Sequence, residues 1–184
     1  MKIIKTNFEG VFILEPDIYY DSRGFFSEIF NKKNFEKATG LNIDFVQDNL
    51  ARSGKGVLRG MHFQKGKNAQ SKLVTVLKGK VQDVIIDIRP ESSTYGKYLS
   101  LILSEENRRQ LFIPKGFAHG YLSLEDENLF YYKIDNYYNK EAEGGIFYAD
   151  KDIGINWLMN QDKLVLSEKD RSLPFFKDFE NERS

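Results

Sequence analysis

The chain has 184 residues, enough for one domain with a sizeable core. It carries 27 Lys and Arg against 27 Asp and Glu, so its formal net charge is zero, and it contains no cysteine. This composition argues against a general nucleic-acid binder, a disulfide framework and a thiolate metal site. No apolar run approaches the ~20 residues of a membrane-spanning helix. We therefore expect a single cytoplasmic domain over residues 1–184, without nucleic-acid or membrane partners.

Short strand-like stretches separated by turn residues fill most of the chain. A repeat of about 8–12 residues with Gly, Pro and Asn between the stretches is typical of all-β sandwiches and barrels. The residues after Asp150 are less regular, and we expect them to pack back over the barrel as short helix and coil. The expected strands are Val11–Glu15, Phe25–Phe30, Ile43–Leu50, the first part of Gly56–Lys72, Leu73–Leu77, Val81–Arg89, Tyr98–Leu103, Gln110–Ile113, Gly120–Leu124 and Asn128–Ile134.

One helix is expected in the first two-thirds of the chain, over Asn34–Gly40. Asn31 or Asn34 is its expected N-cap, and Gly40 is its expected C-terminal stop. A turn is expected before it, at Asp21–Gly24. In the strand after this turn, alternation places Glu28 on one face between two phenylalanines, an unusual position for a carboxylate.

The segment Gly56–Lys72 combines strand-forming residues with many polar side chains, among them His62, one of two histidines in the chain. Polar groups on a strand that belongs to a core are costly unless they are paired or used. Alternation also places Lys72 on one face with two valines, and Tyr132 on one face with a phenylalanine and an isoleucine. Both side chains are therefore predicted to point into the barrel.

Strict alternation puts Arg59 and His62 on opposite faces of their strand. The two side chains can face one site only if Gly60 marks a bulge or a kink. Glycine inside a strand often does so. We therefore expect the strand to be irregular at Gly60.

The second histidine, His119, is expected at the start of a strand and lies in a Pro-x-Gly-x-x-His motif, Pro114–His119. This motif resembles the second motif of the cupins, small β-barrels that often hold iron or manganese. Their first motif has His-x-His where this chain has His62-Phe63-Gln64, so the usual three-histidine site is not available. The remaining His, Lys and Tyr side chains suit proton abstraction next to a carbonyl, with no metal or cofactor.

Several motifs in order, from about Val11 to Pro174, together resemble the dTDP-4-dehydrorhamnose 3,5-epimerase family. They are Asp21–Glu28, Gln47–Asn49, Gly56–Gln64, Gln70–Val74, Ile113–Gly120 and Ser167–Asp170. The resemblance implies a cupin-type jelly roll, free of metal, that works as a homodimer. It also implies epimerisation of dTDP-4-dehydro-6-deoxy-D-glucose at C3 and C5. Three alternatives stay open: epimerisation at one carbon only, a non-catalytic sugar-nucleotide-binding cupin, and a metal-dependent cupin oxygenase.

The same resemblance implies roles for individual residues. His62 is the base, Tyr132 is the acid, Asp170 holds His62, and Lys72 stabilises an enolate. The Arg23–Glu28 strand reaches the site of the neighbouring subunit. The implied substrate-binding residues are Arg23, Phe25, Glu28, Gln47, Asn49, Arg59, His119, Tyr138, Glu143 and Lys169. On the residues alone, alternatives remain for two of these roles, namely Asp83 or Asp87 as the partner of His62 and Tyr131 in place of Tyr132.

Overall fold

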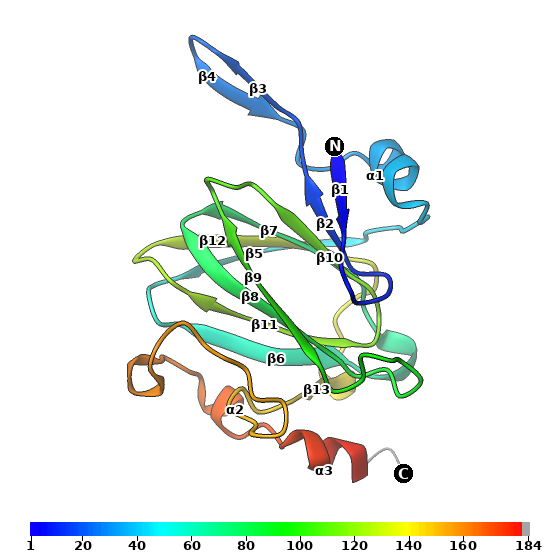
Figure 1. Ribbon diagram of the computed structural model, residues 1–184, viewed down its shortest axis with the longest axis vertical. Coiled ribbons are helices and arrows are strands. Elements are labelled where there is room, and N and C mark those ends of the chain that lie inside the picture. The colour runs from blue at the N-terminus through cyan, green and yellow to red at the C-terminus, as the bar shows by residue number, and fades with distance from the viewer. Residues whose placement is uncertain (182–184) are drawn as a thin grey trace.

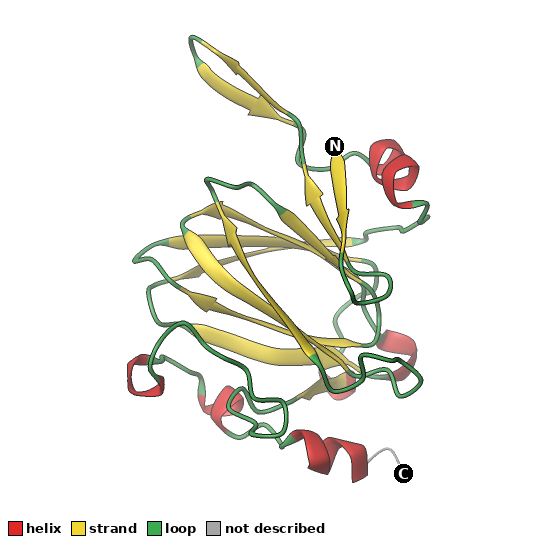
Figure 2. Cartoon of the chain, in the orientation of Figure 1, coloured by secondary structure: helices red, strands yellow, loops and turns green. Residues whose placement is uncertain are grey.

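Two antiparallel β-sheets face each other in the computed structural model, which describes residues 1–181 (Figure 1). The six-stranded sheet has the order β1-β2-β10-β7-β12-β5, and the five-stranded sheet has the order β13-β6-β11-β8-β9. The α-helices are short and lie outside the sheets, as Figure 2 shows. The prediction of an all-β jelly-roll barrel is therefore confirmed.

The elements follow one another along the chain in this order. The strands are β1 (Lys2–Lys5), β2 (Phe12–Glu15), β3 (Ile18–Asp21), β4 (Gly24–Ser27), β5 (Gln47–Ser53), β6 (Leu58–Gln64), β7 (Lys72–Lys78), β8 (Lys80–Asp87), β9 (Tyr98–Ser104), β10 (Gln110–Ile113), β11 (Phe117–Ser123), β12 (Asn128–Ile134) and β13 (Glu143–Gly145). The helices are α1 (Lys32–Thr39), α2 (Glu168–Arg171) and α3 (Phe176–Asn181), with 3-10 turns at Gly66–Asn68, Lys140–Ala142 and Gln161–Lys163.

The main core lies between the two sheets and is built from the side chains that alternation points inward. Val74 and Val76 come from the six-stranded sheet, and Val81 and Ile85 come from the five-stranded sheet. All four are buried, as predicted for the valines that share a face with Lys72. Burying aliphatic side chains from both sheets holds the sheets together, at roughly 1.5–3 kcal/mol for each fully buried side chain.

Three strands were not predicted from the sequence. Strand β1 is a four-residue edge strand, β3 is a four-residue strand that pairs only with β4, and β13 contains two glycines among its three residues. Strand β10 is as short as β1 and β3 but is fully buried, whereas no residue of β1 or β3 is buried, so these two strands lack the apolar pattern of a core strand. Strand β11 also begins earlier than expected, so His119 lies inside the strand and not at its start.

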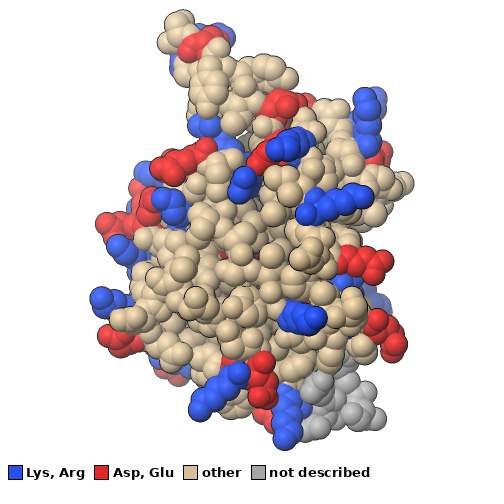
Figure 3. Space-filling model, viewed as in Figure 1, with Lys and Arg blue, Asp and Glu red and all other residues tan. Residues whose placement is uncertain are grey.

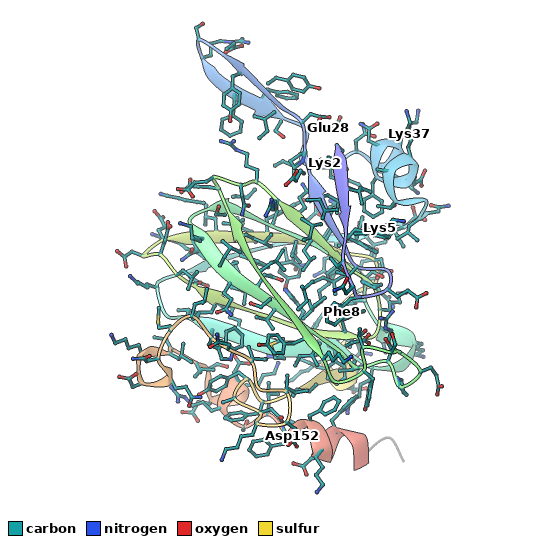
Figure 4. All side chains as sticks on the ribbon, in the orientation of Figure 1. Lys2, Lys5, Phe8, Glu28, Lys37 and Asp152 are labelled. Carbon is teal, nitrogen blue, oxygen red and sulfur yellow. The ribbon has the colours of Figure 1, made fainter. Side chains whose placement is uncertain are left out.

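The β3–β4 hairpin projects away from both sheets (Figure 1). Its turn falls where the sequence predicted it. Strand β4 ends at Ser27, so the prediction that Glu28 lies on one face between Phe26 and Phe30 is wrong. The Glu28 carboxylate accepts hydrogen bonds from the side-chain amides of Asn31 and Asn34, at the foot of the hairpin (Figure 4).

Helix α1 follows this foot and begins earlier than predicted, at Lys32. The side chain of Asn31 caps it by accepting the N–H of Asn34 at 3.2 Å. Gly40 closes the helix in the left-handed region, with φ of 73°. Of the two candidate caps, Asn31 is therefore the one that the structure uses.

Residues after β13 cross the outside of β6 and β13, where Figure 1 shows α2 and α3. This agrees with the expected return of the tail over the barrel. Positive and negative side chains are mixed along the margin of the face seen in Figure 3. No helix in the part of the chain that the structure describes has the length and apolar character needed to cross a bilayer.

Strand β6 contains the irregularity expected at Gly60. His62 pairs with His119 and Arg59 pairs with Tyr121, so three steps along β6 match two steps along β11. The extra residue is a β-bulge. Gly60 has φ of 137°, and a Cβ at this position would lie 2.5 Å from the Cα of Gly120. The bulge lets Arg59 and His62 face the same side of the sheet.

Replacing Gly60 with alanine should therefore be costly. We expect Gly60→Ala to lower the free energy of unfolding by about 2–4 kcal/mol, because it adds a clash with β11 to an unfavourable backbone conformation. Gly66→Ala is the matched control, since Gly66 also has a positive φ, of 57°, but no atom lies within 4 Å of the added Cβ. The control should lose about 1 kcal/mol. Urea denaturation measures both values, and equal losses would contradict a role for the close contact with β11.

Candidate active site

A cleft of about 640 Å³ opens between the two sheets, and the segment 165–170 borders it. Strands β6 and β11 supply one wall, and strands β7 and β12 supply the other. Seven of the side chains singled out in the sequence line this cleft: Arg59, His62, Lys72, His119, Tyr132, Lys169 and Asp170.

His62 and Asp170 are in direct contact. The Nε2 atom of His62 lies 2.6 Å from Oδ1 of Asp170, across a sequence separation of 108 residues. Asp170 sits in the single turn of α2, whose N-cap Ser167 accepts the N–H of Asp170 at 3.1 Å. Burial acts to raise the pKa of Asp170, but the combined effects of His62, Ser167 and Lys169 outweigh it and the pKa is lowered. Asp170 is therefore an ionised carboxylate in direct contact with the His62 imidazole.

Asp83 holds the other histidine. Its Oδ2 atom lies 2.9 Å from Nε2 of His119, and both side chains are buried. Burial lowers the pKa of His119 despite the opposing effect of Asp83, so the ring is neutral near pH 7. Asp87 accepts hydrogen bonds from Arg89 and from two hydroxyl groups of the following loop. Neither alternative carboxylate is therefore the partner of His62.

Lys72 and Tyr132 face the histidines from the six-stranded sheet. Burial removes the ammonium group of Lys72 from water and lowers its pKa to about 8, although Asp83 and Glu143 partly oppose this. Burial also raises the pKa of Tyr132, so its hydroxyl stays protonated at neutral pH. The cleft thus has a carboxylate-backed imidazole on one wall and a proton-carrying phenol on the other.

Arg59 is held at the rim of this cleft by residues that the sequence did not single out. Its Nε donates to Oγ of Ser53 at 3.2 Å, and the hydroxyl of Tyr121 lies 3.4 Å from the same oxygen. The Tyr121 ring stacks on Phe130, with centroids 4.0 Å apart. Tyr121 lies two residues from His119 on β11, so once that strand is extended to Phe117, alternation brings both to one face.

A second recess of about 440 Å³ shares Lys169 with the cleft. Glu143 lies at its centre, accepting the Tyr138 hydroxyl at 2.9 Å and pairing with the Lys169 ammonium at 2.5 Å. Burial acts to raise the pKa of Glu143, but these two partners lower it, so the carboxylate is ionised. Tyr138 is about half exposed, so part of its ring is accessible to a flat ligand.

The remaining predicted residues lie outside the cleft of their own chain. Gln47 and Asn49 are bonded to each other at 2.8 Å on the edge strand β5, next to Tyr132 in the register. Arg23 is largely exposed at the hairpin turn and pairs with Asp21. Phe25 is 56% exposed and lies under the guanidinium of Arg108. In Figure 1 the hairpin projects from the end of the molecule opposite α2, which carries Asp170.

Gln64, which stands where a cupin has its second histidine, has a structural partner. Its side-chain oxygen accepts the N–H of Asn139 at 3.0 Å, and the residue is buried. Within residues 1–181, no three His, Asp or Glu side chains gather as candidate metal ligands.

Comparison with known proteins gives close relatives over nearly the whole chain. A solved structure of dTDP-6-deoxy-D-glucose-3,5-epimerase from Legionella pneumophila, in complex with dTDP-4-keto-L-rhamnose, matches with a TM-score of 0.94 and 45% identity, covering 98% of this chain and 95% of that one. A 3′-monoepimerase from Streptomyces bikiniensis, in complex with dTDP-quinovose, matches with a TM-score of 0.91 and 29% identity, covering 97% and 89%.

The sequence comparisons agree. A protein named dTDP-4-dehydrorhamnose 3,5-epimerase from Escherichia coli (strain K12) is 50% identical over 173 residues, which is 94% of this chain and 93% of the relative. The sequence model of the family with that description matches residues 5–178. The chain therefore belongs to the dTDP-4-dehydrorhamnose 3,5-epimerase family.

Proposed function

We propose that this protein is an isomerase that epimerises dTDP-4-dehydro-6-deoxy-D-glucose at C3 and C5 to dTDP-4-dehydro-L-rhamnose, in the biosynthesis of dTDP-L-rhamnose. The names of its relatives support the substrate class, and the Legionella relative binds dTDP-4-keto-L-rhamnose. The observation that carries the proposal is the pairing of His62 and Tyr132 across the cleft. Inversion at a carbon needs a proton to leave one face and another to arrive on the opposite face, and these two groups lie on opposite walls.

Each inversion then has two proton transfers. His62 removes the proton from C3 or C5, both of which flank the C4 ketone, and the electron pair of the broken C–H bond forms an enolate. Asp170 stabilises the imidazolium that results. The positive charge of Lys72 stabilises the enolate oxygen, and His119 lines the path of the sugar and its diphosphate. Tyr132 protonates the carbon from the opposite face, and solvent then restores the proton of Tyr132 and takes the proton of His62.

The nucleotide part of the substrate extends from the cleft into the neighbouring recess. Arg59 and Lys169 supply positive charge for the diphosphate, and an Arg fork suits such a group. Tyr138 stacks on the base, with Glu143 fixing its hydroxyl. Asn49 has a buried amide nitrogen without a hydrogen-bond partner among the described residues, which suits a contact with substrate. Gln47 supports Asn49 through their shared hydrogen bond.

The protein works as a homodimer in this proposal. Tyr20 and Phe26 on the β3–β4 hairpin are 69% and 68% exposed, which is unusual for large apolar rings on a strand pair. A second copy of the chain would cover them. Arg23 and Phe25 would then reach the partner's cleft, because the hairpin projects away from the elements that line the cleft of its own chain, with Glu28 at its foot.

A related activity at one carbon only is the second candidate. The Streptomyces relative named a 3′-monoepimerase has the same fold, so the fold alone does not fix the number of carbons inverted. The 50% identity to a 3,5-epimerase, against 29% to the monoepimerase, favours inversion at both carbons.

Turnover in D₂O separates these candidates. We expect NMR of the product sugar to show deuterium at both C3 and C5, because each inversion replaces a substrate proton with one from solvent. Label at a single carbon would establish the monoepimerase activity instead. A protein that binds the nucleotide sugar without any exchange would be a non-catalytic member of the fold.

Variants of His62 and Tyr132 should have different effects on deuterium exchange and on product formation. We expect His62→Asn to reduce exchange and product by about 10³-fold or more, because the variant loses the imidazole that removes the substrate proton. Tyr132→Phe should still exchange deuterium at the carbon from which His62 removes the proton, but product formation should fall by about 10²–10⁴-fold because the acid is missing. Near wild-type turnover in His62→Asn would overturn the assignment of the base.

The charge of Lys72 should appear in the pH profile. Because its pKa is lowered to about 8, the side chain is cationic below that pH and neutral above it. We therefore expect kcat/KM to fall as the pH rises through about 8. In Lys72→Arg the guanidinium stays protonated, so this fall should disappear even if the maximal rate is lower. An unchanged alkaline limb in Lys72→Arg would assign it to another group.

The dimer can be tested with two inactive variants. Light scattering should give twice the chain mass of 21.4 kDa. Arg23→Glu and His62→Asn should each be inactive alone. If the hairpin serves the neighbouring subunit, an exchanged 1:1 mixture should recover about a quarter of wild-type activity, because half of the dimers are mixed and each has one complete site. No recovery from dimers shown to have exchanged would mean that the hairpin serves its own subunit.

A further inference from the structure

Asp150 is a buried carboxylate with no part in the chemistry proposed above. It is 3% exposed and lies in the loop that follows β13. Its Oδ1 atom accepts the backbone N–H groups of Asp152 at 2.8 Å and Ile153 at 3.0 Å. Its Oδ2 atom accepts the backbone N–H of Phe176 at 2.7 Å. One oxygen therefore shapes a local turn, near Asp152 in Figure 4, and the other ties that turn to the C-terminal segment.

The tie to Phe176 ends a segment that runs directly beside the candidate active site. The backbone N–H of Phe147 donates to the carbonyl of Pro174 at 2.7 Å. Leu173 packs so closely on Gly145 that a Cβ there would lie 2.6 Å from its Cδ2. Gly145 is the residue that pairs with His62 between β13 and β6. The segment is therefore fixed against the strand position opposite His62.

Helix α2, which carries Asp170, is too short to hold its own position. It has four residues, and a single helical turn is unstable in isolation. On its N-terminal side, the N–H of Val165 donates to Gly56 at 2.8 Å, and Val165 accepts the N–H of Leu58 at 3.0 Å. On its C-terminal side lie the contacts at Pro174 and Phe176. The placement of Asp170 against His62 thus depends on attachments at both ends of the segment.

We propose that Asp150 is a positioning residue for the reaction: by fixing Phe176, it keeps Asp170 within hydrogen-bond distance of His62. This inference rests on the proposed function, in which His62 is the base. Asp150→Asn is the informative variant, because an asparagine retains one acceptor oxygen but offers an NH₂ group at the other position. It cannot serve the turn and Phe176 at the same time.

The first test reads the position of His62 without any substrate. The two histidines each contact a carboxylate, so ¹³C labelling of histidine Cε1 gives two ring signals, which His62→Asn assigns. In Asp150→Asn, we expect the His62 signal to move towards its position in Asp170→Asn. The His119 signal should stay in place, since Asp83 remains its partner. An unmoved His62 signal, or equal shifts of both signals, would overturn the proposal.

The second test is kinetic. We expect Asp150→Asn to lower kcat by about 10- to 100-fold with KM changed less than twofold, because only the alignment of the base is affected. In an Asp170→Asn background it should cause no further loss, since the residue acts through Asp170. An equal loss in both backgrounds would overturn the proposal.

Asp87→Asn also removes a fully buried carboxylate, one whose hydrogen bonds go to Arg89, Ser92 and Thr94. It should lower stability and leave the His62 signal and kcat unchanged. The two failures are distinguishable, because retained turnover in His62→Asn refutes the base role, whereas an unmoved His62 signal in Asp150→Asn refutes the positioning role.

Discussion

The contact between His62 and Asp170 is the constraint on which the arrangement of the candidate site depends. A histidine in the middle of a strand has to meet a carboxylate 108 residues further along the chain, with their polar atoms 2.6 Å apart. Neither residue can bring this about locally. Strand β6 needs its bulge so that His62 faces the cleft. The segment after β13 must cross the outside of the sheet so that α2 places Asp170 beside His62. The long return of the chain after β13 is therefore part of the site.

The same logic separates the two histidines. They are neighbours across β6 and β11, and each contacts a carboxylate. Burial lowers the pKa of His119, which keeps the ring neutral, with its single N–H donated to Asp83. His62 is less buried, and its carboxylate comes from a separate segment. Two residues of one type thus acquire different chemical roles from burial and from the element that supplies the partner.

The sequence pattern was informative wherever alternation ran for several residues. The two strands Gln110–Ile113 and Asn128–Ile134 match their expected bounds, and the inward positions of Lys72 and Tyr132 follow from neighbours on the same strand. Alternation also predicted that the strand is irregular at Gly60 if Arg59 and His62 serve one site, and the bulge confirms it. The resemblance to the family supplied Asp170, which no local pattern indicates, because the pairing is created by tertiary structure.

Other features could not be predicted because no pattern in the sequence marks them. The position of Glu28 was predicted wrongly because no residue near it marks the end of β4 at Ser27. Its carboxylate instead accepts hydrogen bonds from the side-chain amides of Asn31 and Asn34, at the start of α1. Ser53 and Asp150 act through hydrogen bonds to other elements, Ser53 to Arg59 and Asp150 to Phe176, which residue type and spacing do not encode. The roles of such supporting residues become visible only once the backbone is placed.

The facing walls of the cleft have a consequence for how the protein can change. Because His62 and Tyr132 belong to different sheets, the gap between them is set by the thickness of the core, including Val76 and Ile85, and not by any bond within one strand. Close-packed interiors transmit small volume changes to their surroundings. A methyl group added or removed deep in the core therefore alters the spacing of two reacting groups that it never touches, so selection on turnover also acts on the interior.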